Sequence, residues 1–98
     1  MQTYILLTKL SPGLLKKMKD REEIGRIWLD QVKAKCPEVR FISHYYLLGE
    51  FDFLDIYEAP DEETAAKVSI ISQANGAFLA QSLPAIPYKR FLELVEES

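Results

Sequence analysis

The sequence predicts one α+β domain in which a four-stranded antiparallel sheet carries two helices on one face, with a further helix at the C-terminus. Three observations lead to this fold class. Four β-rich runs alternate apolar and polar residues, two apolar stripes at helical spacing lie between them, and glycine or proline stands at most boundaries. The 98 residues leave no room for a second core, so a single domain is expected over residues 1–98.

The first half of the chain is predicted to form a strand, a helical turn and a long helix. Residues 2–9 are β-rich and end at the turn signal Ser11-Pro12-Gly13, which predicts the first strand. Residues 14–19 favour a short helical turn. A helix capped by Asp20 should follow and stop at Pro37. Its apolar positions obey the i, i+3, i+4, i+8 rule: Ile24, Ile27, Trp28 and Val32.

Two strands in hairpin spacing come next. Residues 39–48 and 51–59 are strand-like and are separated by Gly49-Glu50, which predicts a two-residue turn of type II′. Opposed residues in such a hairpin have numbers that sum to 99. The predicted cross-strand pairs are therefore Tyr46 with Phe53, His44 with Asp55, and Ile42 with Tyr57.

The second half adds a helix, a strand and a C-terminal helix. Pro60-Asp61 opens a helix with one apolar stripe and two flanking positions, and Asn75-Gly76 ends it. The stripe consists of Ala65, Val68 and Ile71, flanked by Ala66 and Ile70. Residues 78–86 form a fourth strand, and Pro84 within it predicts an edge position.

The segment after Pro87 predicts a short amphipathic helix that must dock on something apolar. Its aligned apolar residues are Tyr88, Phe91, Leu92 and Val95. The complete order is β-α-β-β-α-β plus this helix, the split βαβ pattern of the ferredoxin-like fold. Right-handed crossovers then place both long helices on one face, with the first and third strands central.

The hairpin register divides its residues between two faces of the sheet. We expect the face under the helices to carry Phe41, Ser43, Tyr45, Leu47, Asp52, Leu54 and Ile56. Asp52 has a structural role on that face, where loop amides satisfy it. We expect the helix-free face to carry Ile42, His44, Tyr46, Phe53, Asp55 and Tyr57. Such an aromatic surface requires a cover, and two stacked copies of the chain or another cover would leave a partly enclosed cavity.

The helix-free face supplies the candidate site. His44 is the only histidine, and a facing Asp55 would fix its tautomer and orient it as a general base. Both are candidate catalytic residues. The candidate ligand-binding residues are His44, Tyr46, Phe53, Asp55 and Tyr57. The alternative interpretation is an ordinary cross-strand polar pair among packing aromatics.

Composition excludes several function classes. A net charge of -3 argues against nucleic acid or an anionic membrane surface as the main partner. The basic cluster Lys16, Lys17, Lys19 and Arg21 is followed directly by two glutamates and is interpreted as a solvated face. Cys36 is the only cysteine, so no internal disulfide forms and a core thiol is expected. The N-terminus resembles neither a signal peptide nor a membrane span, which favours a cytoplasmic location.

Metal and cofactor sites are also not expected. A metal site needs three or four spaced ligands, whereas the chain offers one histidine and scattered carboxylates. No phosphate-binding loop, nucleophile elbow or other cofactor motif occurs.

The hairpin also carries a family resemblance. The stretch Leu48-Gly49-Glu50-Phe51-Asp52-Phe53 and the opening Tyr4-Ile5-Leu6-Leu7 are similar to the GYD domain family, named after a Gly-Tyr-Asp signature at the hairpin. Here Gly49, Glu50, Phe51 and Asp52 occupy that motif, with phenylalanine in place of tyrosine and a glutamate inserted. The resemblance implies a dimeric α+β barrel, a group that contains both enzymes and binding modules.

Two function classes therefore stay open. The preferred one is a small homo-oligomeric domain that binds a small molecule or serves as an accessory or regulatory module. The alternative is a cofactor-free isomerase, decarboxylase or oxygenase that uses His44 with Asp55. In both cases the expected partner is a second copy of the chain.

Overall fold

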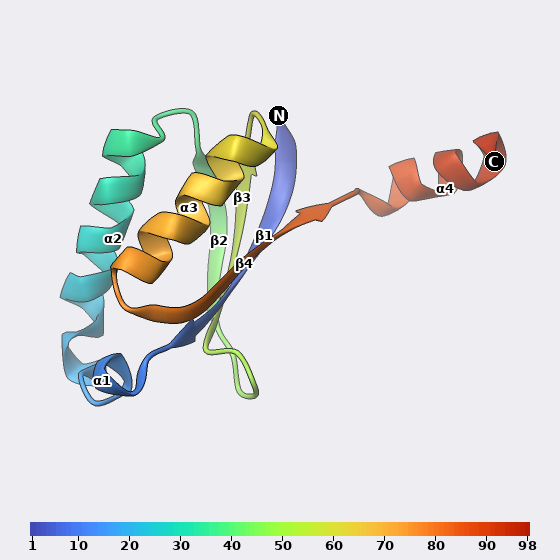
Figure 1. The fold of residues 1–98 in the computed structure, drawn as a ribbon. Helices are drawn as coiled ribbons and strands as arrows, with labels where there is room; N and C mark the ends of the chain where they lie inside the picture. Colours follow the sequence, from blue (N-terminus) through green and yellow to red (C-terminus); the bar gives the residue numbers. More distant parts are fainter.

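The computed structural model describes residues 1–98 and has the predicted α+β architecture (Figure 1). The N-terminal half contains β1 (Gln2–Leu10), α1 (Pro12–Leu15), the 3-10 turn η1 (Met18–Asp20), α2 (Arg21–Lys35) and β2 (Arg40–Tyr46). The C-terminal half contains β3 (Phe53–Ala59), α3 (Glu62–Ala74), β4 (Ala77–Ala85) and α4 (Tyr88–Glu97). The ferredoxin-like βαββαβ order is thus confirmed, with α4 added at the end.

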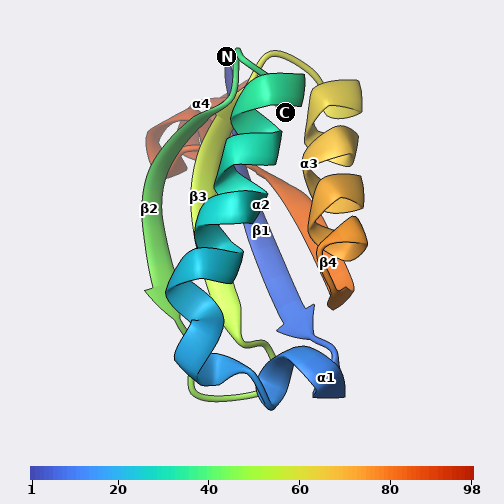
Figure 2. The same cartoon turned by 90° about the vertical axis from the view of Figure 1, so that its left-hand side faces the viewer.

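The sheet has the strand order β2-β3-β1-β4, and each neighbouring pair is antiparallel. β1 and β3 are central, as the sequence predicts, and β4 with Pro84 is an edge strand. α2 and α3 lie side by side across one face of the sheet, and the opposite face has no helix over it (Figures 1 and 2).

The ends of α3 follow the predicted chemistry. The Asp61 carboxylate accepts a hydrogen bond from the Thr64 amide at 2.8 Å, which caps the first turn. At the other end, Gly76 has a φ of +102°, a conformation that favours glycine after a helix. Asp20 precedes α2, but its side chain makes no capping hydrogen bond.

The hairpin differs from the predicted two-residue turn. β2 ends at Tyr46 and β3 begins at Phe53, and the Leu47 amide donates to the Asp52 carbonyl at 2.8 Å. The pairs Tyr46–Phe53 and His44–Asp55 are confirmed. The pair Ile42–Tyr57 is wrong, because a bulge at Ile42 places Phe41 opposite Tyr57.

The predicted assignment of the two faces is reversed for β3 and for His44, whereas Phe41 lies on the helix-covered face as predicted, packed against Trp28. Asp55 and Tyr57 are buried on the helix-covered face, where the Tyr57 hydroxyl lies 3.4 Å from the Ala65 carbonyl of α3. Leu54 and Ile56 alternate with them and therefore lie on the open face, beside Leu7 and Ile5 of β1. The prediction failed because it gave the aliphatic residues to the helices, whereas the aromatic and polar set packs there.

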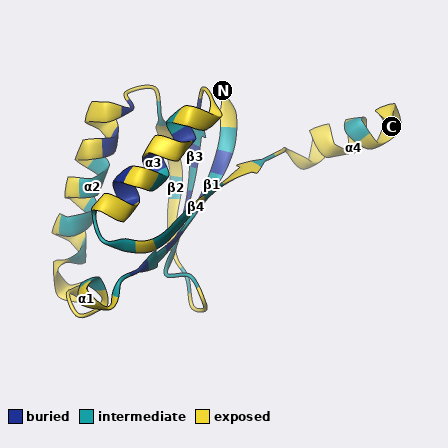
Figure 3. Cartoon of the chain, viewed as in Figure 1, coloured by how far each residue is buried: buried dark blue, intermediate teal, exposed yellow.

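The core lies between the sheet and the helices (Figure 3). Its buried residues are Tyr4, Leu6, Val32, Cys36, Tyr57, Ala59, Ala65, Val68 and Ile71. The Tyr4 and Tyr57 rings stack with their centroids 5.5 Å apart, and the Phe41 ring packs at 5.6 Å from Tyr57. Cys36 is a buried free thiol, as predicted.

α4 forms as predicted but packs on nothing within the chain. It stands at the end of a projecting arm, away from α2 and α3 (Figure 1), and none of its residues is buried. Its apolar stripe is exposed, with Tyr88 at 73% and Phe91 at 51% of full accessibility. None of the helices has the length and hydrophobicity needed to cross a membrane.

Candidate functional site

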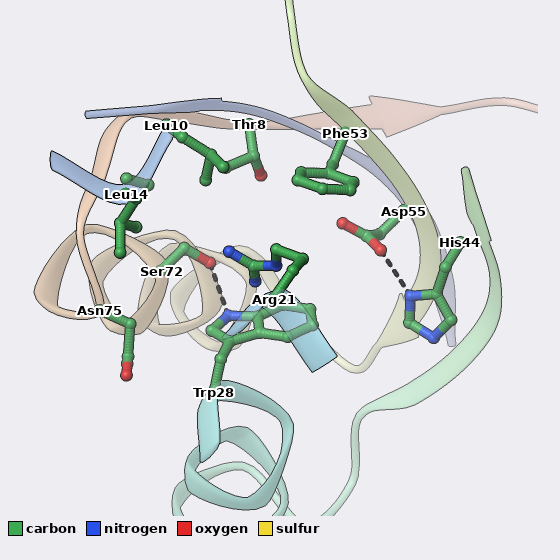
Figure 4. A pocket seen from close by; sticks show the side chains of 11 residues that line it. Thr8, Leu10, Leu14, Arg21, Trp28, His44, Phe53, Asp55, Ser72 and Asn75 are labelled. Atoms are coloured by element: carbon green, nitrogen blue, oxygen red, sulfur yellow. Dashed lines mark hydrogen bonds and ion pairs between the residues drawn. The ribbon is translucent and has the colours of Figure 1, made fainter. Parts of the chain in front are cut away.

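A cavity of about 180 Å³ lies between the sheet and α2, close to the point where β1 leaves the sheet (Figure 4). All four strands and the helices α1, α2 and α3 contribute to its wall. The lining residues are Thr8, Leu10, Leu14, Arg21, Trp28, His44, Phe53, Asp55, Ser72, Asn75 and Ala77. We call this cavity the Arg21 pocket.

One side of the Arg21 pocket is the His44–Asp55 pair. The two residues face each other across β2 and β3, and His44 Nδ1 lies 2.5 Å from Asp55 Oδ1. The Asp55 side chain retains only 9% of its accessibility, whereas that of His44 retains 50%. Burial raises the pKa of the Asp55 carboxyl, and the hydrogen bond and charge of His44 oppose that shift.

Arg21 enters the pocket from the first turn of α2. Its guanidinium lies over the Phe53 ring, with 5.1 Å from the guanidinium carbon to the ring centroid. Burial lowers the pKa of Arg21, and the negative charge of Asp55 counteracts this. No hydrogen bond or ion pair joins the Arg21 side chain to another residue.

The remaining wall combines the apolar side chains of Leu10, Leu14, Trp28 and Ala77 with the polar ones of Thr8, Ser72 and Asn75. The Trp28 indole Nε1 donates to Ser72 Oγ at 2.9 Å, and the Ser72 hydroxyl donates to the Val68 carbonyl at 2.8 Å. Since this chain of bonds joins α2 to α3, the indole is held in one orientation. Leu10 and Leu14 close the opposite side.

Three of the five predicted ligand-binding residues line the pocket: His44, Phe53 and Asp55. Tyr46 is 60% exposed and packs edge-on against Phe53 outside the cavity. Tyr57 is fully buried in the core next to it. Asp52, from the predicted family motif, accepts the Leu10 amide at 2.7 Å and so joins the hairpin loop to β1 in the expected structural role.

Sequence reasoning missed Arg21, because the interpretation of its cluster as a solvated basic face is wrong at this position. The signal was present in the helical spacing. Arg21, Trp28 and Val32 lie on one stripe at i, i+7 and i+11, so the arginine shares the apolar face of α2. An arginine on such a stripe indicates a pocket or a buried partner.

The structure does not bring together three or more histidine, cysteine, aspartate or glutamate side chains in a cluster that could hold a metal ion. The chemistry available in the pocket is that of one guanidinium, one carboxylate and one imidazole. Such a set can bind a charged small molecule or transfer a proton.

Comparison with known proteins adds three likenesses. The model of the GYD domain family matches residues 4–95. A Thermus thermophilus protein named "Glutamine synthetase and cystathionine beta-lyase binding protein" is 31% identical over 88 residues, covering 89% of this chain and 90% of the relative. The solved structure described as "crystal structure of FFRP-DM1" has a TM-score of 0.57 at 19% identity, covering 88% of this chain and 100% of that one. This last likeness concerns the fold alone.

Proposed function

The chain belongs to the GYD domain family, and from that premise we propose that it is a non-catalytic accessory module that binds a metabolic enzyme. The observation that carries the proposal is the 31% identical relative, which is named for binding glutamine synthetase and cystathionine beta-lyase. Because the match spans most of both chains, it concerns the whole domain and not one shared segment.

The exposed stripe of α4 is the surface that we assign to the partner enzyme. Phe91, Leu92 and Val95 follow one another at helical spacing and are about half exposed, at 51%, 46% and 56%. An amphipathic helix of this kind binds by placing its apolar face in a groove of another protein. The arm carries it clear of the domain (Figure 1).

The open face of the sheet supports a homodimer. Ile5, Leu7, Leu54 and Ile56 form an aliphatic surface there, and Leu83 of β4 adds to it at 44% exposure. Two copies that stack these faces would remove them from water. We further propose a cytoplasmic location, which the unpaired thiol of Cys36 supports, since small secreted domains usually pair their cysteines.

Binding to purified glutamine synthetase and cystathionine beta-lyase of the same organism tests the proposal. We expect at least one of them to bind the immobilised full-length chain in biolayer interferometry. Phe91→Asp should abolish that binding, while Glu96→Gln on the polar face of α4 should preserve it. Absence of binding to both enzymes, with the domain folded by circular dichroism, would refute the assignment.

A second candidate, a cofactor-free proton-transfer enzyme, is favoured by the hydrogen bond between His44 and Asp55 at the pocket wall. A carboxylate that holds one imidazole nitrogen orients the other as a base. The His44–Asp55 pair suits the proton transfers of an isomerase or a decarboxylase better than the chemistry of an oxygenase. Turnover of small keto or carboxylic acids that is lost in His44→Gln would establish it in place of the accessory role.

A further inference from the structure

We propose that the Arg21 pocket binds a small carboxylate that carries a hydrogen-bond donor, a hydroxyl or an ammonium group, on the carbon next to the carboxylate. The inference goes beyond enzyme binding and identifies a ligand site and its chemical class. It rests on two charged groups that face the cavity without satisfying each other.

The first group is the Arg21 guanidinium. Its central carbon lies 5.1 Å from the Phe53 ring centroid, and it has no hydrogen-bond or ion-pair partner in the chain. A guanidinium in this position offers a fork of N–H donors that matches the two oxygens of a carboxylate. The cation–π contact with Phe53 holds the guanidinium at the cavity before a ligand arrives.

The second group is the free oxygen of Asp55. Asp55 Oδ1 is hydrogen-bonded to His44 Nδ1, whereas Asp55 Oδ2 has no hydrogen-bond partner. The Asp55 side chain is nevertheless about nine-tenths buried, with 9% of its accessibility left. Figure 4 shows this oxygen directed into the cavity, on the side of Arg21 and Phe53. A carboxylate oxygen accepts hydrogen bonds, so it selects a donor on the ligand.

The two charges together define the ligand. A carboxylate bound only to Arg21 would lie near the Asp55 charge and be repelled by it. A donor next to that carboxylate would remove the repulsion, because it would bind Asp55 Oδ2 while the carboxylate bound Arg21. The pocket is therefore complementary to the paired acceptor and donor of a 2-hydroxy or 2-amino acid.

The cavity sets the size and character of the remaining part. At about 180 Å³ it has room for a short side chain beside the polar end. Leu10, Leu14 and Trp28 make that part of the wall apolar. A branched aliphatic side chain of three or four carbons meets both conditions.

Titration of the full-length chain with four probes tests the proposal. The probes are 2-hydroxy-3-methylbutanoate, valine, 3-methylbutanoate and 2-hydroxy-3-methylbutanamide. Trp28 is the only tryptophan, so its single indole N–H signal in a ¹H–¹⁵N spectrum reports on occupation of the pocket. The hydroxy acid, valine or both should shift it. The acid without a donor and the neutral amide should bind at least about tenfold more weakly, the usual effect of losing a hydrogen bond to a charged group.

Three variants locate the effect. Arg21→Gln should weaken binding at least about tenfold, and Arg26→Gln, an exposed arginine on the same helix, should leave it unchanged. Asp55→Asn should improve binding of 3-methylbutanoate relative to the hydroxy acid, because the repelling charge is gone. Such a gain cannot result from misfolding.

The outcomes separate this inference from the broader functions proposed above. Equal binding of 3-methylbutanoate and the hydroxy acid to the wild-type chain would overturn the ligand class but keep a carboxylate site. No shift with any probe, or shifts unaffected by Arg21→Gln, would overturn the site itself. Binding of a partner enzyme through α4 is measured separately, so neither result decides it.

Discussion

At the scale of single residues, two buried phenols define the core. Tyr57 has no exposed surface, stacks on Tyr4 and donates its hydroxyl proton to Ser82 Oγ at 2.7 Å. Burial raises the pKa of Tyr57 to about 12, and burial also raises that of Tyr4. The folded state therefore holds these protons more tightly than the unfolded chain, where a tyrosine ionises near pH 10.

We expect the free energy of unfolding to fall as the pH rises from about 10 to about 12. Below pH 10 both states keep the phenol protonated, and above it the unfolded state loses its proton first. Each such phenol contributes a slope of up to about 1.4 kcal/mol per pH unit. Urea unfolding at several alkaline pH values measures the slope, and Tyr57→Phe should reduce it by one proton while Tyr88→Phe on the arm should not. Equal slopes for Tyr57→Phe and the wild-type chain would contradict the assignment.

The sequence predicts the His44–Asp55 pair but not its surroundings. The pair follows from the hairpin register alone, since alternation and antiparallel pairing are local rules. Arg21 was missed because its neighbours in sequence are charged residues, whereas Phe53 and Asp55, its neighbours in space, come from β3. The bulge at Ile42 was missed for a similar reason. It allows Phe41 to pack against Trp28 of α2, which is distant in sequence, with the two ring centroids 5.2 Å apart.

At the scale of elements, α2 and the C-terminal end of α3 each have a glycine, and the two glycines differ in backbone conformation and in the space around them. Gly25 lies inside α2, and an added Cβ would meet Arg21 Nη2 at 3.5 Å, an ordinary contact. Gly76 ends α3 with a φ of +102°, and an added Cβ would come within 2.5 Å of Leu14 Cδ1. The fold therefore does not require glycine at position 25, whereas it requires glycine at position 76.

Alanine at these positions should have opposite effects. Gly25→Ala should raise the free energy of unfolding by up to about 1 kcal/mol, from helix propensity. Gly76→Ala should lower it by about 1–3 kcal/mol, because alanine is strained at positive φ and Leu14 must move. Denaturant unfolding of the two variants side by side checks the pair, and equal stability of both would refute this account of the packing.

The elements themselves were largely predictable. Strand alternation, helical spacing and the boundary residues Asp61, Asn75 and Gly76 gave the order and most of the bounds. The choice of face was not predictable from these patterns, because both faces of the sheet are largely apolar. Only the position of α2 and α3 decides which one becomes the core.

At the scale of the whole molecule, the open sheet face is the basis of the proposed dimer. Ile56 lies near its centre, paired with Ile5 of β1 and Ser43 of β2. We expect the wild-type chain to have about twice its mass of 11.3 kDa in light scattering at micromolar concentration. Ile56→Glu should give a monomer, since a carboxylate would be buried in the contact.

The control for this experiment is Ile70→Glu. Ile70 is on α3 and 61% exposed, so the same change there should leave the dimer intact. A monomeric wild-type chain, or dissociation by both substitutions, would contradict a contact through the open face.

The arm that carries α4 gives the proposed dimer a property that neither copy has alone. The dimer would carry two projecting α4 helices, so a target with repeated subunits could bind both of them at once. Once the first α4 has bound, the second α4 is at a high effective concentration near the next binding groove of the target. The overall avidity can then exceed the affinity of one α4 by about 10²–10⁴. A helix that binds weakly by itself could then form a lasting attachment, and the strength of that attachment would depend on whether the two copies stay together.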